Sequence, residues 1–436
     1  MDLRLFNTLT RRVEPFVPLV PGEVRMYTCG PTVYRPVHLG NLRSYLLADW
    51  LRRTFELWGW RVTQVKNITD VGHMRQDVVD RGEDKVIAAA LAEGKTPMEI
   101  AANYEARFHD DERMLGIHEA THYPRATGHV PEMVAMIERL VAGGHAYVAE
   151  GHVYYSVTSW PTYGELSRLS RDEMLPVALE RGSRPEMPGR RDPLDFVLWQ
   201  PSLSGEPAWD SPWGAGRPGW HIECSAMSTT YLGPHFEIHG GGADLAFPHH
   251  ESEIAQTEAA TGERPWVEFW MHAGMLRLDD EKMSKSLGNL VLVRDLLQTY
   301  SGDAIRLYLV GHHYRDELAY READLEAAAV EASRLRQACR VAELIEPAAP
   351  AAADPETLGP DVREFRRRFL AAIDDDLDTP AAIPELLALA GLALDASEPA
   401  QRAEAGWMVR ELGARVLGLR LATVPSLSEV AEAVPT

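Results

Sequence analysis

The order of elements near the N-terminus constrains the fold more than any other feature of this chain. Residues 24–30 read as a short buried strand that ends in a glycine turn. Apolar residues then recur at helical spacing over residues 42–58, and a second strand is expected over residues 61–68. Strand, turn, helix and strand in that order begin a βαβ unit, so we expect an α/β fold built on a parallel sheet.

The middle of the chain differs from the start in its expected elements and its composition. A helix over residues 131–141, a strand-like stretch at 152–157 and a loop rich in Arg, Pro and Gly at 181–191 predict an insertion that splits the sheet domain. Strand and loop signals resume at Gly219 and continue to about Val293, so the segment around Cys224 is expected to be strand and loop.

Helical signals dominate the rest. Thr96 and Glu99 predict a capping box for a helix that ends near Met114. After Leu297 the chain is helical, and the expected C-terminal elements predict an α-helical bundle. These elements are a Pro/Ala-rich connection at 346–360, a helix over 361–377, one that opens at Thr379-Pro380 and a last one near 401–419.

Composition excludes several classes of protein. The chain has 436 residues, 45% of them apolar, and no apolar stretch approaches the roughly 20 residues of a membrane helix. Its start lacks a secretion signal and it has three cysteines, so we expect a cytoplasmic protein without a disulfide framework and without a membrane partner. The net charge of −21 means that any nucleic-acid contact must use a local basic face.

The first motif runs from Cys29 to Asn41, where the first strand gives way to the first helix. Ligands bind at such points of a parallel sheet, and a helix N-terminus favours a phosphate. Gly40 lets a nucleotide approach the backbone, while His38 and Asn41 can donate hydrogen bonds to triphosphate oxygens. A four-residue HLGN string arises often by chance, so a purely structural role stays open.

Two further motifs have the composition of phosphate sites. Lys282 and Lys285, in KMSKSLGN, suit a mobile loop that neutralises a departing pyrophosphate, although such a string alone is more often a solvated turn. Three consecutive glycines, which include Gly241 and Gly242, admit a ligand close to the backbone, and Asp244 could accept from a hydroxyl. The alternative for the glycines is a flexible turn.

A fourth group of residues has the chemistry of a zinc site. His249 and Glu253 are four apart after Pro248, an expected first helical position, so both project from one face of a helix. With the thiolates of Cys29 and Cys224 they make a possible Zn²⁺ site. Spacing does not establish that they meet, since the two cysteines are 195 positions apart. Cys339 reads as a packed helix residue without a task.

Taken together, the chain resembles the cysteinyl-tRNA synthetases, a family of class I aminoacyl-tRNA synthetases. The matching stretches cover about residues 1–420 in the family's order: YTCGPTVY, HLGN, NITDVGHM, DFVLW, GWHIECSAM, HGGGADLAFPHHESE, EKMSKSLGN and DDDLDTP. Asn41 stands where the HIGH-type motif has His, and it keeps a hydrogen-bonding side chain.

The resemblance implies an architecture and its boundaries. It implies a Rossmann-type catalytic domain split by an inserted connective domain and followed by an α-helical bundle. The implied parts are the first catalytic half at 1–115, the insertion at 116–199, the second half with the KMSKS loop at 200–296, a stem-contact region at 297–330, the bundle at 331–421 and a disordered tail at 422–436.

The resemblance also implies an activity and its residues. It implies activation of L-cysteine with Mg²⁺-ATP to cysteinyl-adenylate, transfer to the 3′ end of tRNA-Cys, and one Zn²⁺ per chain, in a protein expected to be a monomer. It places Zn²⁺ on Cys29, Cys224, His249 and Glu253. It places Lys285 on ATP, with Thr69, Trp220 and His239 near the amino acid. Because cysteine and serine are nearly isosteric, metal coordination of the substrate sulfur would discriminate between them, and no editing domain is expected.

Alternatives remain beside this prediction. The family usually continues into a small anticodon-reading domain, and this chain stops soon after Leu419. The mycothiol-pathway ligase lacks that domain and transfers activated cysteine to an amino-sugar amine; residues 272–275 are similar to it, whereas CGPTVY, NITDVGHM and Glu253 favour the synthetase. A third alternative is an inactive paralogue that only binds tRNA. The arginines within 181–191 and 363–368 are candidate tRNA contacts, or simply solvated.

Overall fold

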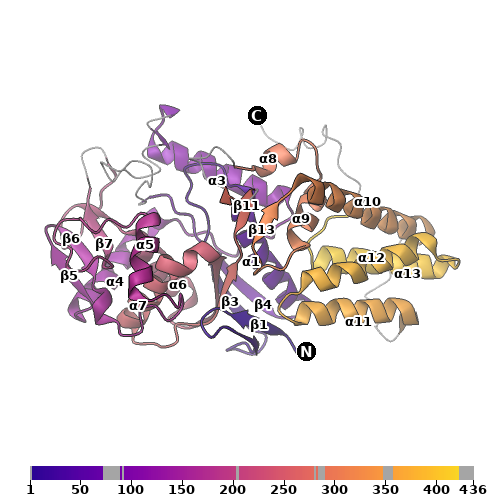
Figure 1. The fold of residues 1–436 in the computed structure, drawn as a ribbon, viewed down its shortest axis with the longest axis horizontal. Helices are drawn as coiled ribbons and strands as arrows, with labels where there is room; N and C mark the ends of the chain where they lie inside the picture. Colours follow the sequence, from indigo (N-terminus) through magenta and orange to yellow (C-terminus); the bar gives the residue numbers. More distant parts are fainter. Residues whose placement is uncertain are drawn as a thin grey trace. The chain divides into compact units, whose positions relative to one another are not determined.

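The structure is a computed structural model that describes residues 2–71, 89–90, 93–202, 206–278, 290–346 and 357–421, and the backbone of residues 281–282. The chain forms two compact units (Figure 1). The larger comprises Arg4–Arg294 and Tyr314–Ala319, and the smaller comprises Met1–Leu3, Asp295–His313 and Tyr320–Thr436.

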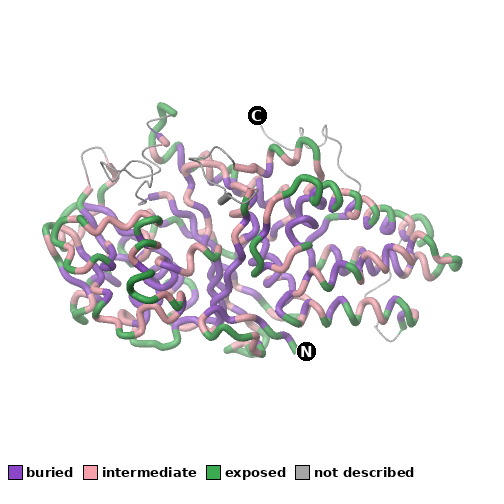
Figure 2. Tube along the Cα trace, viewed as in Figure 1, coloured by how far each residue is buried: buried purple, intermediate pink, exposed green. Residues whose placement is uncertain are grey.

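A four-stranded parallel sheet lies at the centre of the larger unit, which confirms the predicted α/β fold. Its strand order is β10-β9-β3-β4. The strands are β3 (Glu23–Thr28), β4 (Arg61–Lys66), β9 (Phe236–Gly242) and β10 (Val267–Ala273). Figure 2 shows this sheet mostly in the colour of buried residues. The connection from β3 leads to one side and that from β9 to the other, so ligands are expected where β3 and β9 end side by side.

The described residues of the larger unit's sheet domain form five helices. They are α1 (Leu39–Leu57), α3 (Pro97–Met114), α6 (Trp220–Leu232), α7 (Glu251–Thr261) and the short α8 (Val293–Leu296), which continues into the smaller unit. The capping box predicted for α3 is confirmed: Thr96 Oγ1 accepts from the backbone N–H of Glu99 at 3.2 Å, and the Glu99 carboxylate accepts from the backbone N–H of Thr96 at 2.8 Å.

Two local predictions are wrong. The segment around Cys224 is not strand and loop but helix α6, which begins at Trp220 after the N-cap Gly219. The helix was missed because its residues from Ile222 to Ser228 are all buried, so it shows no apolar stripe at helical spacing. Pro248 does not open helix α7 either. It lies in an irregular turn, Ala246–His250, in which Phe247 has extended backbone angles, and α7 begins at Glu251.

The inserted segment forms an antiparallel sheet of its own, in the order β5-β6-β7-β8. Its elements are α4 (Val130–Ala142), β5 (Ala146–Ala149), β6 (His152–Tyr155), α5 (Arg171–Glu180), β7 (Phe196–Pro201) and β8 (Gly216–Pro218). This sheet runs past the predicted boundary at residue 199, because β8 returns to pair with β7. The other strands that the structure describes in the larger unit form the hairpin β1 (Arg4–Asn7) and β2 (Arg12–Pro15), and the small sheet of β11 (Leu276–Leu278), β12 (Glu281–Lys282) and β13 (Leu318–Tyr320).

The smaller unit is helical, as predicted. It contains α9 (Gly302–Val310), α10 (Glu322–Ile345), α11 (Pro360–Asp374), α12 (Thr379–Asp395) and α13 (Pro399–Arg415). The side chain of Asp378 caps α12, and Thr379 Oγ1 donates to the carbonyl of Val310 at 2.6 Å, which ties α12 to α9. The predicted tail at 422–436 lies outside the described residues. Among the helices that the structure describes, none combines the length and the hydropathy needed to span a membrane.

Candidate active site

The four residues predicted to bind zinc come together from three parts of the sheet domain. Cys29 follows β3, Cys224 lies in α6, His249 is in the irregular turn before α7, and Glu253 is in the first turn of α7. One ligand atom from each lies within 4.8 Å of the others, and all four residues are buried. Two thiols, an imidazole and a carboxylate converge here with the composition of a tetrahedral zinc site.

The side chain of His249 is held on three sides. Its Nε2 is 2.9 Å from Glu253 Oε1 and 3.5 Å from Cys224 Sγ. Its Nδ1 is 2.9 Å from Nδ1 of His221. The ring of Trp220 stacks on it, with centroids 4.2 Å apart. Because His221 engages the outer nitrogen, the inner nitrogen is directed at the ligand group, as in metal sites whose histidines are oriented by a neighbouring side chain.

The electrostatics of the group favour a positive charge at its centre. Burial opposes a charge on His249, but the carboxylate of Glu253 and the thiol of Cys224 outweigh burial and raise the pKa of His249 to about 10. Burial would raise the pKa of Glu253, yet His249 and His239 lower it to about 2. Burial raises the pKa of both thiols, and the carboxylate of Glu253 acts in the same direction. A divalent cation at this position would replace the thiol protons, so the residues present fit Zn²⁺.

Sequence reasoning missed a chain of histidines behind Cys29. His250 Nε2 is 3.3 Å from Cys29 Sγ, and His250 Nδ1 is 2.8 Å from His272 Nε2. His272 Nδ1 is in turn 2.8 Å from Thr8 Oγ1. Cys29, His239, His250 and Glu253 also have ligand atoms within 4.8 Å of one another. The only signal was the pair of adjacent histidines at 249–250, of which the helical spacing selected one.

The residues expected near the amino acid adjoin the same group. His239, on β9, has Nε2 2.8 Å from Glu253 Oε2. Thr69 Oγ1 donates to Glu223 Oε2 at 3.1 Å, and Glu223 directly precedes Cys224. Trp220 contacts His249 as described. Glu223 is a further buried residue of the site that its sequence context did not reveal.

The predicted nucleotide residues lie at the neighbouring strand ends. His38 is the N-cap of α1, and Asn41 Oδ1 accepts from the backbone N–H of His38 at 3.2 Å, so this motif has the structural role that the sequence left open. A side chain at Gly40 would come within 3.0 Å of the His38 ring.

A side chain at either of the two glycines that end β9 would force neighbouring side chains to move. A Cβ at Gly241 would lie 2.8 Å from Leu245 Cδ1, and one at Gly242 would lie 2.5 Å from Asp244 Oδ1 and 3.3 Å from Ser44 Oγ of α1. The Gly241–Asp244 turn therefore faces the first turns of α1. The Lys285 residue and the side chain of Lys282 are outside the described residues, and the backbone of Lys282 pairs with Arg277.

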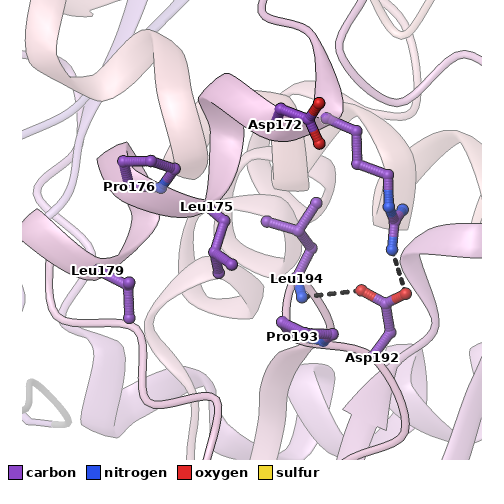
Figure 3. Close-up of a pocket in the computed structure, with 8 residues that line it drawn as sticks. Asp172, Leu175, Pro176, Leu179, Asp192, Pro193 and Leu194 are labelled. Carbon is purple, nitrogen blue, oxygen red and sulfur yellow. Dashed lines mark hydrogen bonds and ion pairs between the residues drawn. The ribbon is translucent and has the colours of Figure 1, made fainter.

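A hollow in the inserted segment does not belong to this group. It has a volume of about 370 Å³ and lies between helix α5 and the loop that contains Asp192 (Figure 3). Arg171 and Leu194 both bond to Asp192 there, and Leu175, Leu179 and Pro193 line it. No predicted site residue lines this hollow.

Comparisons with known proteins identify the relatives of the chain. The family model described as tRNA synthetases class I (C) catalytic domain matches residues 15–330. A cysteine–tRNA ligase of Alkalilimnicola ehrlichii is 46% identical over 422 residues, which are 96% of this chain and 85% of that protein. A cysteine–tRNA ligase of Rhodospirillum rubrum is 47% identical over 420 residues, with the same shares.

Solved structures share the fold at low sequence identity. Methionyl-tRNA synthetase of Mycobacterium tuberculosis, in complex with methionyl-adenylate, has a TM-score of 0.62 and 14% identity over 94% of this chain and 96% of that chain. LeuRS of Agrobacterium radiobacter, in a ternary complex with tRNA and LeuAMS, has a TM-score of 0.65 and 11% identity over 95% and 87%. These likenesses bear out the predicted class of fold.

Proposed function

The chain belongs to the cysteinyl-tRNA synthetases of class I, and from that premise we propose that it activates L-cysteine at a zinc site and charges tRNA-Cys with it. The activity is that of a cysteine–tRNA ligase, which consumes ATP and releases AMP and pyrophosphate. The observation that carries the zinc proposal is the buried convergence of Cys29, Cys224, His249 and Glu253 within 4.8 Å.

Those four residues would hold one Zn²⁺. When bound, the ion supplies a soft Lewis acid that binds the thiolate of cysteine far better than the hydroxyl of serine. Neighbouring side chains orient the ligands: His221 and Trp220 contact the ring of His249, and His239 contacts the carboxylate of Glu253. We assign Thr69, Trp220 and His239 to the walls around the amino acid.

ATP would bind between the N-terminus of α1 and the turn at the end of β9. His38, Gly40, Asn41, Gly241, Gly242 and Asp244 would line this site, and the close approach of Gly242 to Ser44 of α1 supports the assignment. Backbone N–H groups and the helix dipole at the start of α1 favour phosphate. The cysteine carboxylate attacks the α-phosphorus, the bond to the β-phosphate oxygen breaks, and pyrophosphate leaves with Mg²⁺. His38, Asn41, Lys282 and Lys285 would stabilise the developing charge without covalent or acid–base chemistry.

The decisive experiment follows labelled cysteine through both steps. With Mg²⁺-ATP we expect cysteine-dependent pyrophosphate exchange, and label on acid-precipitable total tRNA. Exchange without label on tRNA, in a preparation of confirmed activity, would contradict the proposed acceptor. Serine in place of cysteine is the control, and it should support neither reaction. The monomeric state, the cytoplasmic location and the domain boundaries stay predictions.

A further inference from the structure

A cavity of about 400 Å³ in the larger unit is lined by arginines in a chain that is otherwise strongly acidic. Arg11, Arg181 and Arg315 line it, and no acidic side chain is among the described residues that do. Its walls come from the β1–β2 hairpin, from the inserted segment and from the turn after β9. A cavity with this lining is built for an anion.

Arg11 brings an uncompensated charge to this cavity. Its Nη2 donates to the carbonyls of Leu166 at 3.0 Å and Ser167 at 3.4 Å, which fixes the guanidinium between the hairpin and the inserted segment. Burial, together with the charge of Arg168, lowers the pKa of Arg11. No carboxylate is among the groups that shift this pKa, so no acidic neighbour within the described residues balances the charge of Arg11.

Arg181 and the aromatic residues complete the lining. Arg181, which follows α5, donates to the carbonyl of Asp244, and its Nη1 lies 4.0 Å from Asp244 Oδ2. Phe6 lies in the wall with the guanidinium of Arg315 over its ring, 4.6 Å from the centroid. Cations beside flat aromatic faces are the side chains that bind single-stranded nucleic acid, through its phosphates and its bases.

The cavity adjoins the candidate metal group but not the nucleotide residues of α1. His272 lines the cavity, and it reaches Cys29 through a single further imidazole, that of His250. His38, Gly40 and Asn41 are not among the lining residues. An anion in this cavity would lie close to the activated amino acid, and Arg181 also connects the cavity with Asp244 of the proposed ATP turn.

We propose that this cavity receives the single-stranded 3′ end of the tRNA, with Arg11 and Arg181 on phosphodiester oxygens and Phe6 against a base. The proposal rests on the proposed function, because it requires a tRNA acceptor. The same cations could instead serve the triphosphate of ATP, since both ligands offer phosphate oxygens. The two ligands differ in the step that they affect: ATP binding affects adenylate formation, whereas tRNA binding affects only the transfer.

The test compares Arg11→Gln, Arg181→Gln and the double variant with Arg168→Gln. The Gln side chains keep a donor for the carbonyls of Leu166 and Asp244 while removing one charge each. Arg168 is the matched control: it is exposed, donates to the carbonyl of Leu9 at 2.8 Å, and does not line the cavity. KM values for ATP and cysteine come from pyrophosphate exchange, and KM for tRNA comes from aminoacylation at several salt concentrations.

We expect each single variant to raise the KM for tRNA about tenfold, the loss of one charge-assisted hydrogen bond. The salt dependence of binding should fall by about 0.7 per lost phosphate contact, as for single strands. Exchange should match that of Arg168→Gln. Phe6→Leu should raise the KM for tRNA without changing the salt slope.

Three outcomes would overturn the proposal. A KM for tRNA equal to that of Arg168→Gln would mean that the cavity does not contact tRNA. A raised KM for ATP in exchange would assign the arginines to the triphosphate. Absent exchange in the unmodified protein would contradict the proposed function itself, and the proposal with it. If Arg11→Gln unfolds at a lower temperature, Arg181→Gln decides, because its side chain is partly exposed and ends a helix.

Discussion

The indole of Trp220 stacks on the imidazole of His249 with ring centroids 4.2 Å apart and planes only 16° from parallel. Trp220 is the first residue of α6, which carries Cys224, and His249 lies in the turn before α7, which carries Glu253, so this contact joins the segments that supply three of the four candidate zinc ligands. It also places an aromatic wall beside the proposed position of the substrate thiol.

Replacing this wall should weaken the site without unfolding the protein. Stacked aromatic pairs contribute about 0.5–1.5 kcal/mol beyond their buried area, so Trp220→Ala should lower the affinity for zinc and raise the KM for cysteine, each up to about tenfold. Competition with a chelator and pyrophosphate exchange measure the two quantities. Trp220→Phe keeps a stacking ring and should stay within twofold of the unmodified protein; equal losses in both variants would contradict a stacking role.

Cys224→Ser should remove zinc and the preference for cysteine over serine together. A serine hydroxyl is a poor ligand for Zn²⁺, and Cys224 Sγ lies 3.5 Å from His249 Nε2 in the ligand group. Metal content by atomic spectroscopy and exchange with each amino acid measure the effect. Cys339→Ser, which changes a buried thiol of α10 far from the ligand set in sequence, is the control and should retain one zinc per chain. Full zinc content in Cys224→Ser would refute the site.

Lys285→Ala should slow adenylate formation by a factor of about a hundred or more, with the fold intact. The reason is the loss of a positive charge where pyrophosphate charge develops in the transition state. Single-turnover formation of cysteinyl-adenylate measures the rate. Lys95→Ala provides the control, since Lys95 is exposed and pairs with Glu93 at 3.0 Å. An unchanged rate in Lys285→Ala would show that this loop does not act on ATP.

The parts of the fold that could be predicted from sequence are those with local sequence patterns. The βαβ start, the Thr96–Glu99 capping box and the bundle helices follow from residues close together in the chain, and the structure confirms them. Helix α6 escaped because it is buried on nearly every side and so has no polar stripe to reveal its period.

The spatial arrangement of the candidate site could not be predicted from local sequence patterns. Nothing in the spacing brings Cys29 to Cys224, because only the packing of α6 and α7 against the end of β3 does so. Residue chemistry offered these four side chains as a possible zinc site, and the resemblance then named them as its ligands. The contacts of His250 with Cys29 and His272 depend on three separate elements, and no local pattern encodes them.

The buried ion pair of Lys66 and Glu112 should be essential for stability. Lys66 has no exposed side-chain surface, its ammonium lies 5.0 Å from the ring of Tyr45, and Glu112 also accepts from Tyr123 at 2.9 Å. Lys66→Met leaves the carboxylate buried without its cation, which costs about 3–5 kcal/mol of unfolding free energy. Urea denaturation measures the loss.

The exposed pair of Arg367 and Glu364 supplies the comparison. Their atoms are 2.7 Å apart on the surface of α11, where solvent screens the attraction. Arg367→Met should leave the unfolding free energy nearly unchanged. Similar effects of Lys66→Met and Arg367→Met would mean that burial does not set the strength of the first pair.

Cys339 should make the stability of the smaller unit fall at alkaline pH. Burial raises the pKa of its thiol from 9.0 to about 12, although the charge of Arg410 acts in the opposite direction. Between these values the unfolded chain releases the thiol proton and the folded chain keeps it. The unfolded state therefore binds fewer protons, and the unfolding free energy decreases as pH rises.

The contribution of this thiol to the unfolding free energy is fully present below pH 9.0 and is lost as pH approaches 12. Urea denaturation between pH 8 and pH 10.5 should therefore show a steeper decline of the unfolding free energy for the unmodified protein than for Cys339→Ala. The difference in slope is at most about 1.4 kcal/mol per pH unit. Parallel declines in the two proteins would mean that this thiol ionises as readily in the folded chain as in the unfolded one.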